Sequence, residues 1–166
     1  MPNKCHDTLK VTGPASELAR FKKRAAGGSS LGKRSQAEAP EILNFNRLLP
    51  MPKDLLPARC KDQLDDWIWR NWGCRDALDA SLARETSKTL VYEFWTAWSP
   101  PLRLIQRLST RWTQCHFEVE YFIVHTWISG TARAHKGVLK HNCIDFSMEL
   151  DEAYRSGRKV PSTENF

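Results

Sequence analysis

The residue types that most often carry catalysis are sparse in this sequence and form no catalytic pattern. It contains no glycine-rich phosphate loop, no H-E-x-x-H helix motif and no G-x-S-x-G turn. Two acidic pairs, Asp65 with Asp66 and Asp76 with Asp79, could supply paired carboxylates, but acids on the surface of a helix are the commoner explanation. We therefore expect a protein that is not an enzyme and that uses no cofactor.

Thiols and imidazoles are present, but their spacing does not build a metal site. The five cysteines contain no C-x-x-C pair; they are Cys5, Cys60, Cys74, Cys115 and Cys143. Cys5 and His6 are neighbours in a predicted strand and so point to opposite faces, which excludes a nucleophile–base pair. His135, His141 and Cys143 come nearest to a zinc set but lack a fourth ligand nearby in the sequence. Reduced thiols in a bacterial-type cytoplasm are the expected state.

Positive charge is concentrated at the start of the chain. The 166 residues carry a net charge of +6, and the first 34 hold eight Lys or Arg against two acids, which leaves seventeen of each in the rest. Such a cluster can be a solvated helix face, or it can attract nucleic acid or an acidic protein surface. The candidate nucleic-acid contacts are Arg20, Lys22, Lys23, Arg24, Lys33 and Arg34.

Seven tryptophans are a high count for a chain of this length. Exposed tryptophan is enriched at protein interfaces and can also stack on nucleic-acid bases. Trp69 falls off the apolar face of its predicted helix, Trp95 lies opposite the other large residues of its strand, and Trp127 begins a predicted strand. We predict these three as protein contacts, together with Asn71 and Trp98, which belong to two turns that either form a pocket or only support the core.

The elements that would position these residues begin with a short strand at residues 7–12. Leu18, Phe21 and Ala25 then mark one face of a helix. Residues 27–40 are rich in Gly, Ser and basic side chains, which predicts a flexible loop. A second short strand is expected over residues 43–49.

A helical insertion is expected over residues 53–88, with an amphipathic helix at about 60–71 and an ambiguous stretch at 74–88. The strongest strand pattern covers residues 89–97, which are rich in aromatic and β-branched side chains. Ser99 is the predicted N-cap of the next helix, because two prolines follow it. Further strands are expected at 116–124, 127–133 and 138–150.

This order predicts one α+β domain over residues 1–156, with a disordered tail at 157–166. Two β-α-β units are typical of a ferredoxin-like antiparallel sheet, here with the helical insertion and a C-terminal hairpin extension. No apolar run approaches the ~20 residues that a membrane span needs.

Four segments together resemble a known family. They are M-P-N-K-C at the start, N-R-L-L-P-M-P at residues 46–52, N-W-G at 71–73 and T-A-W-S-P-P at 96–101. In this order they resemble the Api92-like or YubB-like proteins of phages and plasmids, over roughly residues 1–125. The resemblance implies a ferredoxin-like fold and an accessory role on a mobile element, and it carries no activity.

The chain departs from that family's pattern in two places. Cys74-Arg75-Asp76-Ala77 replaces a Thr-Lys-Trp-Asp-like run, and residues 122–127 replace an acidic, glycine-rich stretch. A function that depends on these regions would be changed or lost here.

The expected function is binding to a host protein complex, with counter-defence, such as inhibition of a CRISPR complex, as its most concrete form. The alternative is a DNA- or RNA-binding module that uses the basic N-terminal patch. RNA binding on the open face of the sheet is disfavoured, because Glu93, Glu118 and Glu120 are expected there.

Overall fold

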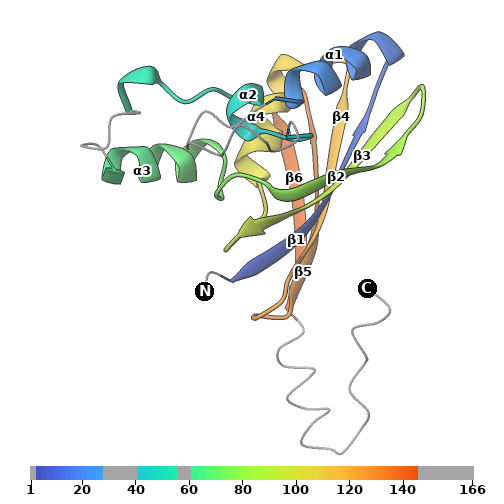
Figure 1. Cartoon of the computed structure of the whole chain (residues 1–166). Coiled ribbons are helices and arrows are strands. Elements are labelled where there is room, and N and C mark those ends of the chain that lie inside the picture. Colours follow the sequence, from blue (N-terminus) through green and yellow to red (C-terminus); the bar gives the residue numbers. More distant parts are fainter. Residues whose placement is uncertain (1–2, 28–40, 56–60, 146–166) are drawn as a thin grey trace, which may run out of the picture.

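The sheet is built around β1 (Lys4–Thr12), which pairs antiparallel with β3 (Thr89–Ala97) on one side and with β4 (His116–Ile123) on the other. β2 (Leu78–Glu85) flanks β3, while β5 (Ile128–His135) and β6 (Val138–Asp145) continue the sheet beyond β4. The resulting order is β2-β3-β1-β4-β5-β6 (Figure 1). The computed structural model describes residues 3–27, 41–55 and 61–145.

The helices are α1 (Ala15–Ala25), α2 (Phe45–Leu48), the 3-10 helix η1 (Lys53–Leu55), α3 (Lys61–Asn71) and α4 (Leu102–Arg111). The chain order β1-α1-β2-β3-α4-β4, with β1 between β3 and β4, is the βαββαβ arrangement of the ferredoxin-like fold. The predicted α+β, ferredoxin-like class is confirmed. β5 and β6 form the predicted hairpin extension.

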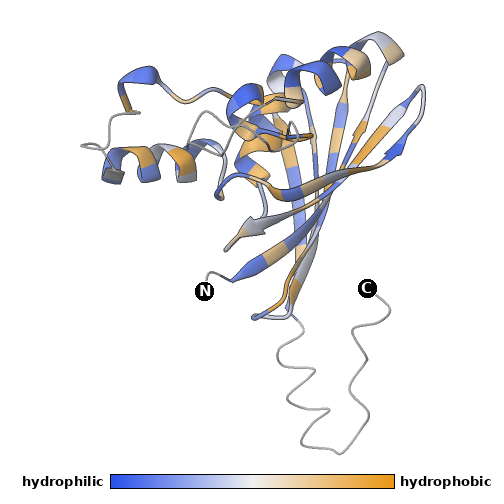
Figure 2. Ribbon diagram, viewed as in Figure 1, coloured by the Kyte–Doolittle hydropathy of each residue, from blue (hydrophilic) through white to orange (hydrophobic). Residues whose placement is uncertain are grey.

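Phe21 of α1 lies at the centre of the core. Its ring centroid is 5.4 Å from that of Trp112, 5.7 Å from that of Phe117 and 6.2 Å from that of Tyr92. All four residues are buried, and the apolar segments of helices and sheet meet in this region (Figure 2). Large aromatic side chains from one helix and two strands thus hold α1 against one face of the sheet.

A second aromatic group attaches the insertion to the same face. Phe45 of α2 packs edge-on against Trp72, just after α3, and against Phe94 of β3, with centroids 5.8 Å apart in both pairs. Trp72 is fully buried, and its Nε1–H donates to the Leu49 carbonyl oxygen over 3.1 Å. Trp72 of the N-W-G segment is therefore part of the core.

The predicted strand at residues 43–49 is wrong. Asn44 begins a short helix instead, because its side chain accepts a hydrogen bond from the Arg47 backbone N–H. The second strand of the fold is β2, within the predicted helical insertion 53–88. β2 is an edge strand and is mostly exposed, so it lacks the apolar alternation that predicts a strand. The insertion thus lies between α1 and β2, inside the first half of the fold.

Ser99 does not act as the predicted N-cap. The N-cap position of α4 is Pro101, and the Ser99 hydroxyl donates to the Gly73 carbonyl oxygen over 2.6 Å. The predictions for residues 28–40 and 157–166 lie outside the described residues.

Asp7 is a buried acid on the helix-facing side of β1. Thr96 Oγ1 lies 2.6 Å from Asp7 Oδ2 and 2.9 Å from the Ser99 carbonyl oxygen. A hydroxyl has one hydrogen, so both contacts are hydrogen bonds only when Asp7 is protonated and donates to Thr96, which then donates to Ser99. Burial raises the pKa of Asp7 from 3.8 to about 7 and outweighs the opposite effect of the hydrogen bonds with Thr96 and Cys5.

We expect the free energy of unfolding to decrease as the pH rises from about 4 to about 7 and then to level off. The unfolded chain releases the Asp7 proton near the ordinary pKa, whereas the folded chain keeps it up to about pH 7. Between about pH 5 and about pH 8 this group lowers stability by roughly 2–3 kcal/mol. Asp7→Asn cannot ionise and should lose that part of the pH dependence. Urea unfolding of both proteins at the two pH values measures the difference, and an equal pH dependence would contradict the assignment.

Candidate functional site

One face of the sheet carries no helix among the described residues, and the strand register sorts its side chains into rows. The even-numbered side chains of β1 point to this open face, because the odd-numbered ones, from Cys5 to Val11, are buried beneath the helices. Each open-face position of β1 lies beside open-face positions of β3 and β4, and the pairing continues through β5 and β6.

The row at the N-terminal end of β1 is aromatic and apolar. His6 lies between Trp95 of β3 and Phe122 of β4, and the His6 and Trp95 ring centroids are 4.8 Å apart. Trp127, in the β4–β5 turn, packs edge-on against Phe122 at 5.9 Å. The Lys4 ammonium lies 5.6 Å from the Trp95 centroid. We call His6, Trp95, Phe122 and Trp127 the aromatic row.

Exposed aliphatic residues extend the aromatic row to both edges of the sheet. Leu78 of β2 pairs with Trp95 and is 45% exposed, while Ile144 of β6 pairs with Ser129 in the same row and is 49% exposed. The row thus runs across all six strands and is aromatic or aliphatic on every strand except β5, where Ser129 stands. Such strips mark interaction surfaces.

The next row is acidic. Glu93 and Glu120 flank Thr8 on either side, and both glutamates are exposed. Neither has an ion-pair partner among the residues that the structure describes. The predicted placement of glutamates on the open face is confirmed, and this part of the face repels phosphate.

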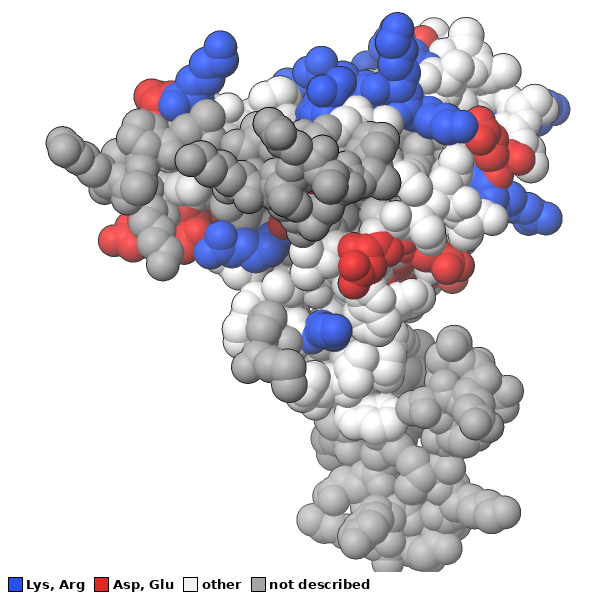
Figure 3. Space-filling view, in the orientation of Figure 1, with Lys and Arg blue, Asp and Glu red and all other residues white. Residues whose placement is uncertain are grey.

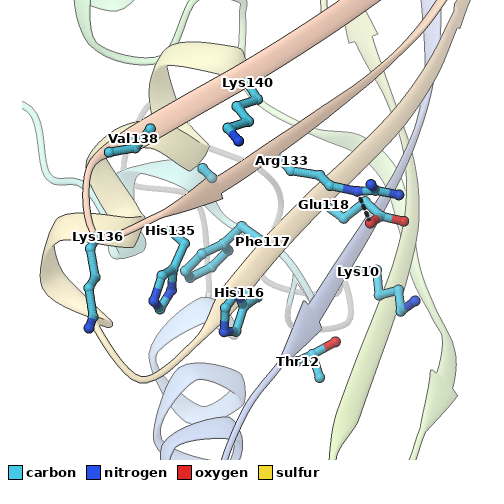
Figure 4. Close-up of a pocket in the computed structure, with 11 residues that line it drawn as sticks. Lys10, Thr12, His116, Phe117, Glu118, Arg133, His135, Lys136, Val138 and Lys140 are labelled. Atoms are coloured by element: carbon cyan, nitrogen blue, oxygen red, sulfur yellow. Dashed lines mark hydrogen bonds and ion pairs between the residues drawn. The ribbon is translucent and has the colours of Figure 1, made fainter.

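The opposite end of the open face is cationic and forms a groove of about 490 Å³ (Figure 4). Lys10, Arg133 and Lys140 lie side by side on β1, β5 and β6, with Glu118 between the first two. Arg133 Nε donates to Glu118 over 2.6 Å, so this acid is neutralised. The acid-free stretch with Arg133, Lys136 and Lys140 is visible in the sequence, but the groove is not, because Lys10 joins these cations only through the cross-strand register.

Two histidines complete the groove. The rings of His116 on β4 and His135 on β5 are stacked, with centroids 3.9 Å apart and planes inclined by 8°. His135 Nδ1 lies 3.1 Å from the Cys115 carbonyl oxygen. A carbonyl can only accept, so Nδ1 carries the hydrogen and Nε2 is left as an acceptor in the neutral ring.

Of the predicted protein contacts, three lie at the aromatic end of the face. Trp95 and Trp127 belong to the aromatic row. Trp98 directly follows β3; its backbone N–H donates to the Asn3 carbonyl oxygen, and its side chain is 51% exposed. Trp69 is 41% exposed on α3, away from this row. The Asn71 side chain donates to the Trp67 carbonyl oxygen within its own helix.

The two turns expected to form a pocket do meet. The Ser99 hydroxyl contacts Gly73, and the Leu104 N–H donates to the Trp72 carbonyl oxygen over 3.2 Å. These bonds join α3 to α4 through buried groups, so the contact supports the core.

The predicted basic patch is partly engaged by acids. Arg20 pairs with Glu17 at 3.2 Å and Lys22 with Glu85 at 2.6 Å, while Lys23 and Arg24 are exposed on α1. Lysine and arginine side chains gather over α1 at the top of the view in Figure 3. Lys33 and Arg34 lie outside the described residues.

The structure adds arginines that the sequence analysis missed. Arg47 of α2 donates to the Arg24 carbonyl oxygen over 3.3 Å, and Arg111 of α4 donates to the Leu48 carbonyl oxygen over 3.2 Å. Arg103 and Arg107 continue the stripe along α4, which carries no acid. The four-residue spacing of these arginines was the sequence signal. With Lys23 and Arg24 they form the helical basic surface.

The zinc candidate is separated by the fold. His135 points to the open face, whereas His141 lies on the opposite face, where its Nε2 is 2.7 Å from the Tyr121 hydroxyl oxygen. Within the described residues, no group of three or more His, Cys, Asp or Glu side chains could hold a metal ion. Cys5, Cys74, Cys115 and Cys143 are free thiols. No helix of the described segments is long and apolar enough to cross a membrane.

Comparisons with known proteins agree with this architecture. The family model described as "Ferredoxin-like domain in Api92-like protein" matches residues 77–158. The crystal structure of a protein api92 from Yersinia pseudotuberculosis is similar to this chain with a TM-score of 0.63. That likeness covers 89% of this chain and 99% of the other at 8% sequence identity, so it shows the fold alone. No curated protein matches the sequence.

The described elements have the ferredoxin-like topology, and the family's own domain model covers the segment from β2 to beyond β6. Residues 77–158 of this chain belong to the ferredoxin-like domain of the Api92-like family.

Proposed function

We propose that this protein is a non-enzymatic accessory protein of a phage or plasmid that docks on a protein complex in the cytoplasm of the bacterial host. The observation that carries the proposal is the aromatic row on the open face, extended by Leu78 and Ile144. Clustered aromatic side chains supply most of the binding energy in protein interfaces. Trp95, Phe122 and Trp127 are the proposed anchors.

The acidic row defines the chemistry of the partner. Glu93 and Glu120 lie one row, or about 7 Å, from the aromatic side chains. A partner that buries the aromatic row must place cations opposite these carboxylates, or it leaves two charges desolvated and unpaired. The proposed partner is therefore a protein with an apolar patch bordered by Lys or Arg. Nucleoprotein complexes, including CRISPR-type defence complexes, carry such basic protein surfaces.

In-cell photo-crosslinking tests this docking surface. With a benzophenone amino acid in place of Trp127 we expect a covalent adduct with one host protein, whereas the same probe at exposed Trp69 on α3 should give none. Phe122→Ala should weaken the complex by about 30-fold or more, because interface aromatics contribute roughly 2 kcal/mol or more.

Charge reversal separates specific docking from hydrophobic adhesion. Glu93→Arg with Glu120→Arg should abolish the adduct while leaving the thermal transition unchanged, since both side chains are exposed. An adduct that survives this reversal, or equal adducts from positions 127 and 69, would contradict the proposal.

A second candidate function, nucleic-acid binding, is favoured by the helical basic surface. Lys23, Arg24, Arg103 and Arg107 are exposed, and none of them forms an ion pair with an acid within the described residues. Cations from two helices on the same side of the sheet can follow a phosphate backbone.

Salt dependence tests this second candidate. If each of three cations contacts one phosphate of duplex DNA, Lys23→Gln, Arg24→Gln and Arg107→Gln together should reduce the log–log salt slope by about 2.7. Fluorescence anisotropy with a labelled duplex between about 50 and 200 mM salt measures the slope. Arg75→Gln is the matched control, because Arg75 is paired with Asp65 at 2.7 Å. An unchanged slope in the triple variant would exclude this surface.

A further inference from the structure

We propose that the cationic groove at the far end of the open face binds a nucleotide, with the base stacked on His116 and the phosphate held by Lys10 and Lys140. The groove lies about 20 Å from the aromatic row, since six residues of β1 separate Thr12 from His6. The inference goes beyond the proposed docking function and does not depend on it.

The charges of the groove favour an anionic ligand. Four cationic side chains line it, Lys10, Arg133, Lys136 and Lys140, against the single carboxylate of Glu118. Arg133 already holds that carboxylate at 2.6 Å. The three lysines have no ion-pair partner within the described part of the chain. A phosphate entering the groove would meet unpaired ammonium groups, with the nearest acid neutralised.

The stacked histidines favour a ligand with a planar ring that can continue the stack. His135 is held in place by its hydrogen bond to Cys115, and His116 lies against it at 3.9 Å. On the other side of His116 the register places Thr12, whose short side chain adds no further ring to the row. A third ring can therefore extend the stack above β1 (Figure 4). Nucleic-acid bases stack on histidine as on other aromatic side chains.

Size and composition also fit a nucleotide. A groove of about 490 Å³ falls within the range of small-molecule sites, about 300–1,000 Å³. Val138 gives it an apolar wall, while the charged groups lie at its borders. Inorganic phosphate would use the lysines but not the stack, and an uncharged base would use the stack but not the lysines. A nucleotide uses both, whether it is free or is one unit of a strand.

Isothermal titration with AMP, adenosine and inorganic phosphate tests this assignment. We expect AMP to bind at least about tenfold more tightly than either part alone. His116→Ala should weaken AMP binding by about tenfold through loss of stacking. Lys10→Gln with Lys140→Gln should weaken it by a similar factor or more through loss of charge-assisted contacts.

The matched control is Lys53→Gln with Arg75→Gln, which removes two exposed cations from the insertion between α1 and β2. It should change AMP affinity by less than about twofold, because neither side chain lines the groove and solvent screens exposed charges. A four-nucleotide RNA distinguishes the two sources of the ligand. Tighter binding than AMP, with the same sensitivity to the groove variants, identifies a strand, and equal binding identifies a free nucleotide.

Three results would overturn the inference: no binding of AMP or RNA, an equal loss in the control pair, or no effect of His116→Ala. The His116 and lysine side chains are exposed, so these variants should keep the wild-type thermal transition. Failure of the cross-linking at position 127 would leave this result unaffected, because the groove variants leave the aromatic row intact.

Discussion

The register of β1 is the constraint on which the rest of the structure depends. Its nine residues pair without a bulge with β3, and Cys5 to Thr12 pair without a bulge with β4. Since side chains alternate along a strand, a slip of one residue would turn Leu9 and Val11 to solvent and Lys10 into the core. The same register aligns the aromatic, acidic and cationic rows across the open face. The core and the candidate binding surface are therefore two consequences of one pairing.

The buried acid reinforces that register at the end where β3 leaves the sheet. The Thr96 hydroxyl of β3 contacts both the Asp7 carboxyl group of β1 and the Ser99 carbonyl oxygen. Ser99 in turn binds Gly73 at the end of α3. A chain of hydrogen bonds thus runs from the central strand to the insertion. It holds in place the end of β3, which carries Trp95, and the turn that carries Trp98. A buried polar group of this kind specifies one arrangement, because any other would leave it unsatisfied.

The sequence predicted correctly the helices and strands that bury one face against the core. The prediction failed for elements whose side chains are mostly exposed. Residues 89–97 were predicted with the bounds of β3, and the helix face of Leu18, Phe21 and Ala25 is buried as expected. β2 was missed because an edge strand with most of its side chains exposed shows no apolar period. Residues 43–49 were misread because a short apolar run fits a strand as well as a helix. Trp95 was placed on the correct face, but the groove could not be predicted, since Lys10, His116 and Lys140 meet only through cross-strand register.

The open face has an acidic row and, at one end, a cationic groove. This charge distribution limits which partners can cover the whole face. A nucleic-acid strand laid along β1 from the groove would reach Glu93 and Glu120 within two rows, where its phosphates are repelled. A purely basic protein surface would suit the acidic row but would meet four cations in the groove. A partner that presents a basic, partly apolar protein surface about 20 Å from an exposed nucleotide satisfies both ends. The two proposals for this face, made from separate residues, therefore describe one composite partner, a protein that holds a nucleic acid.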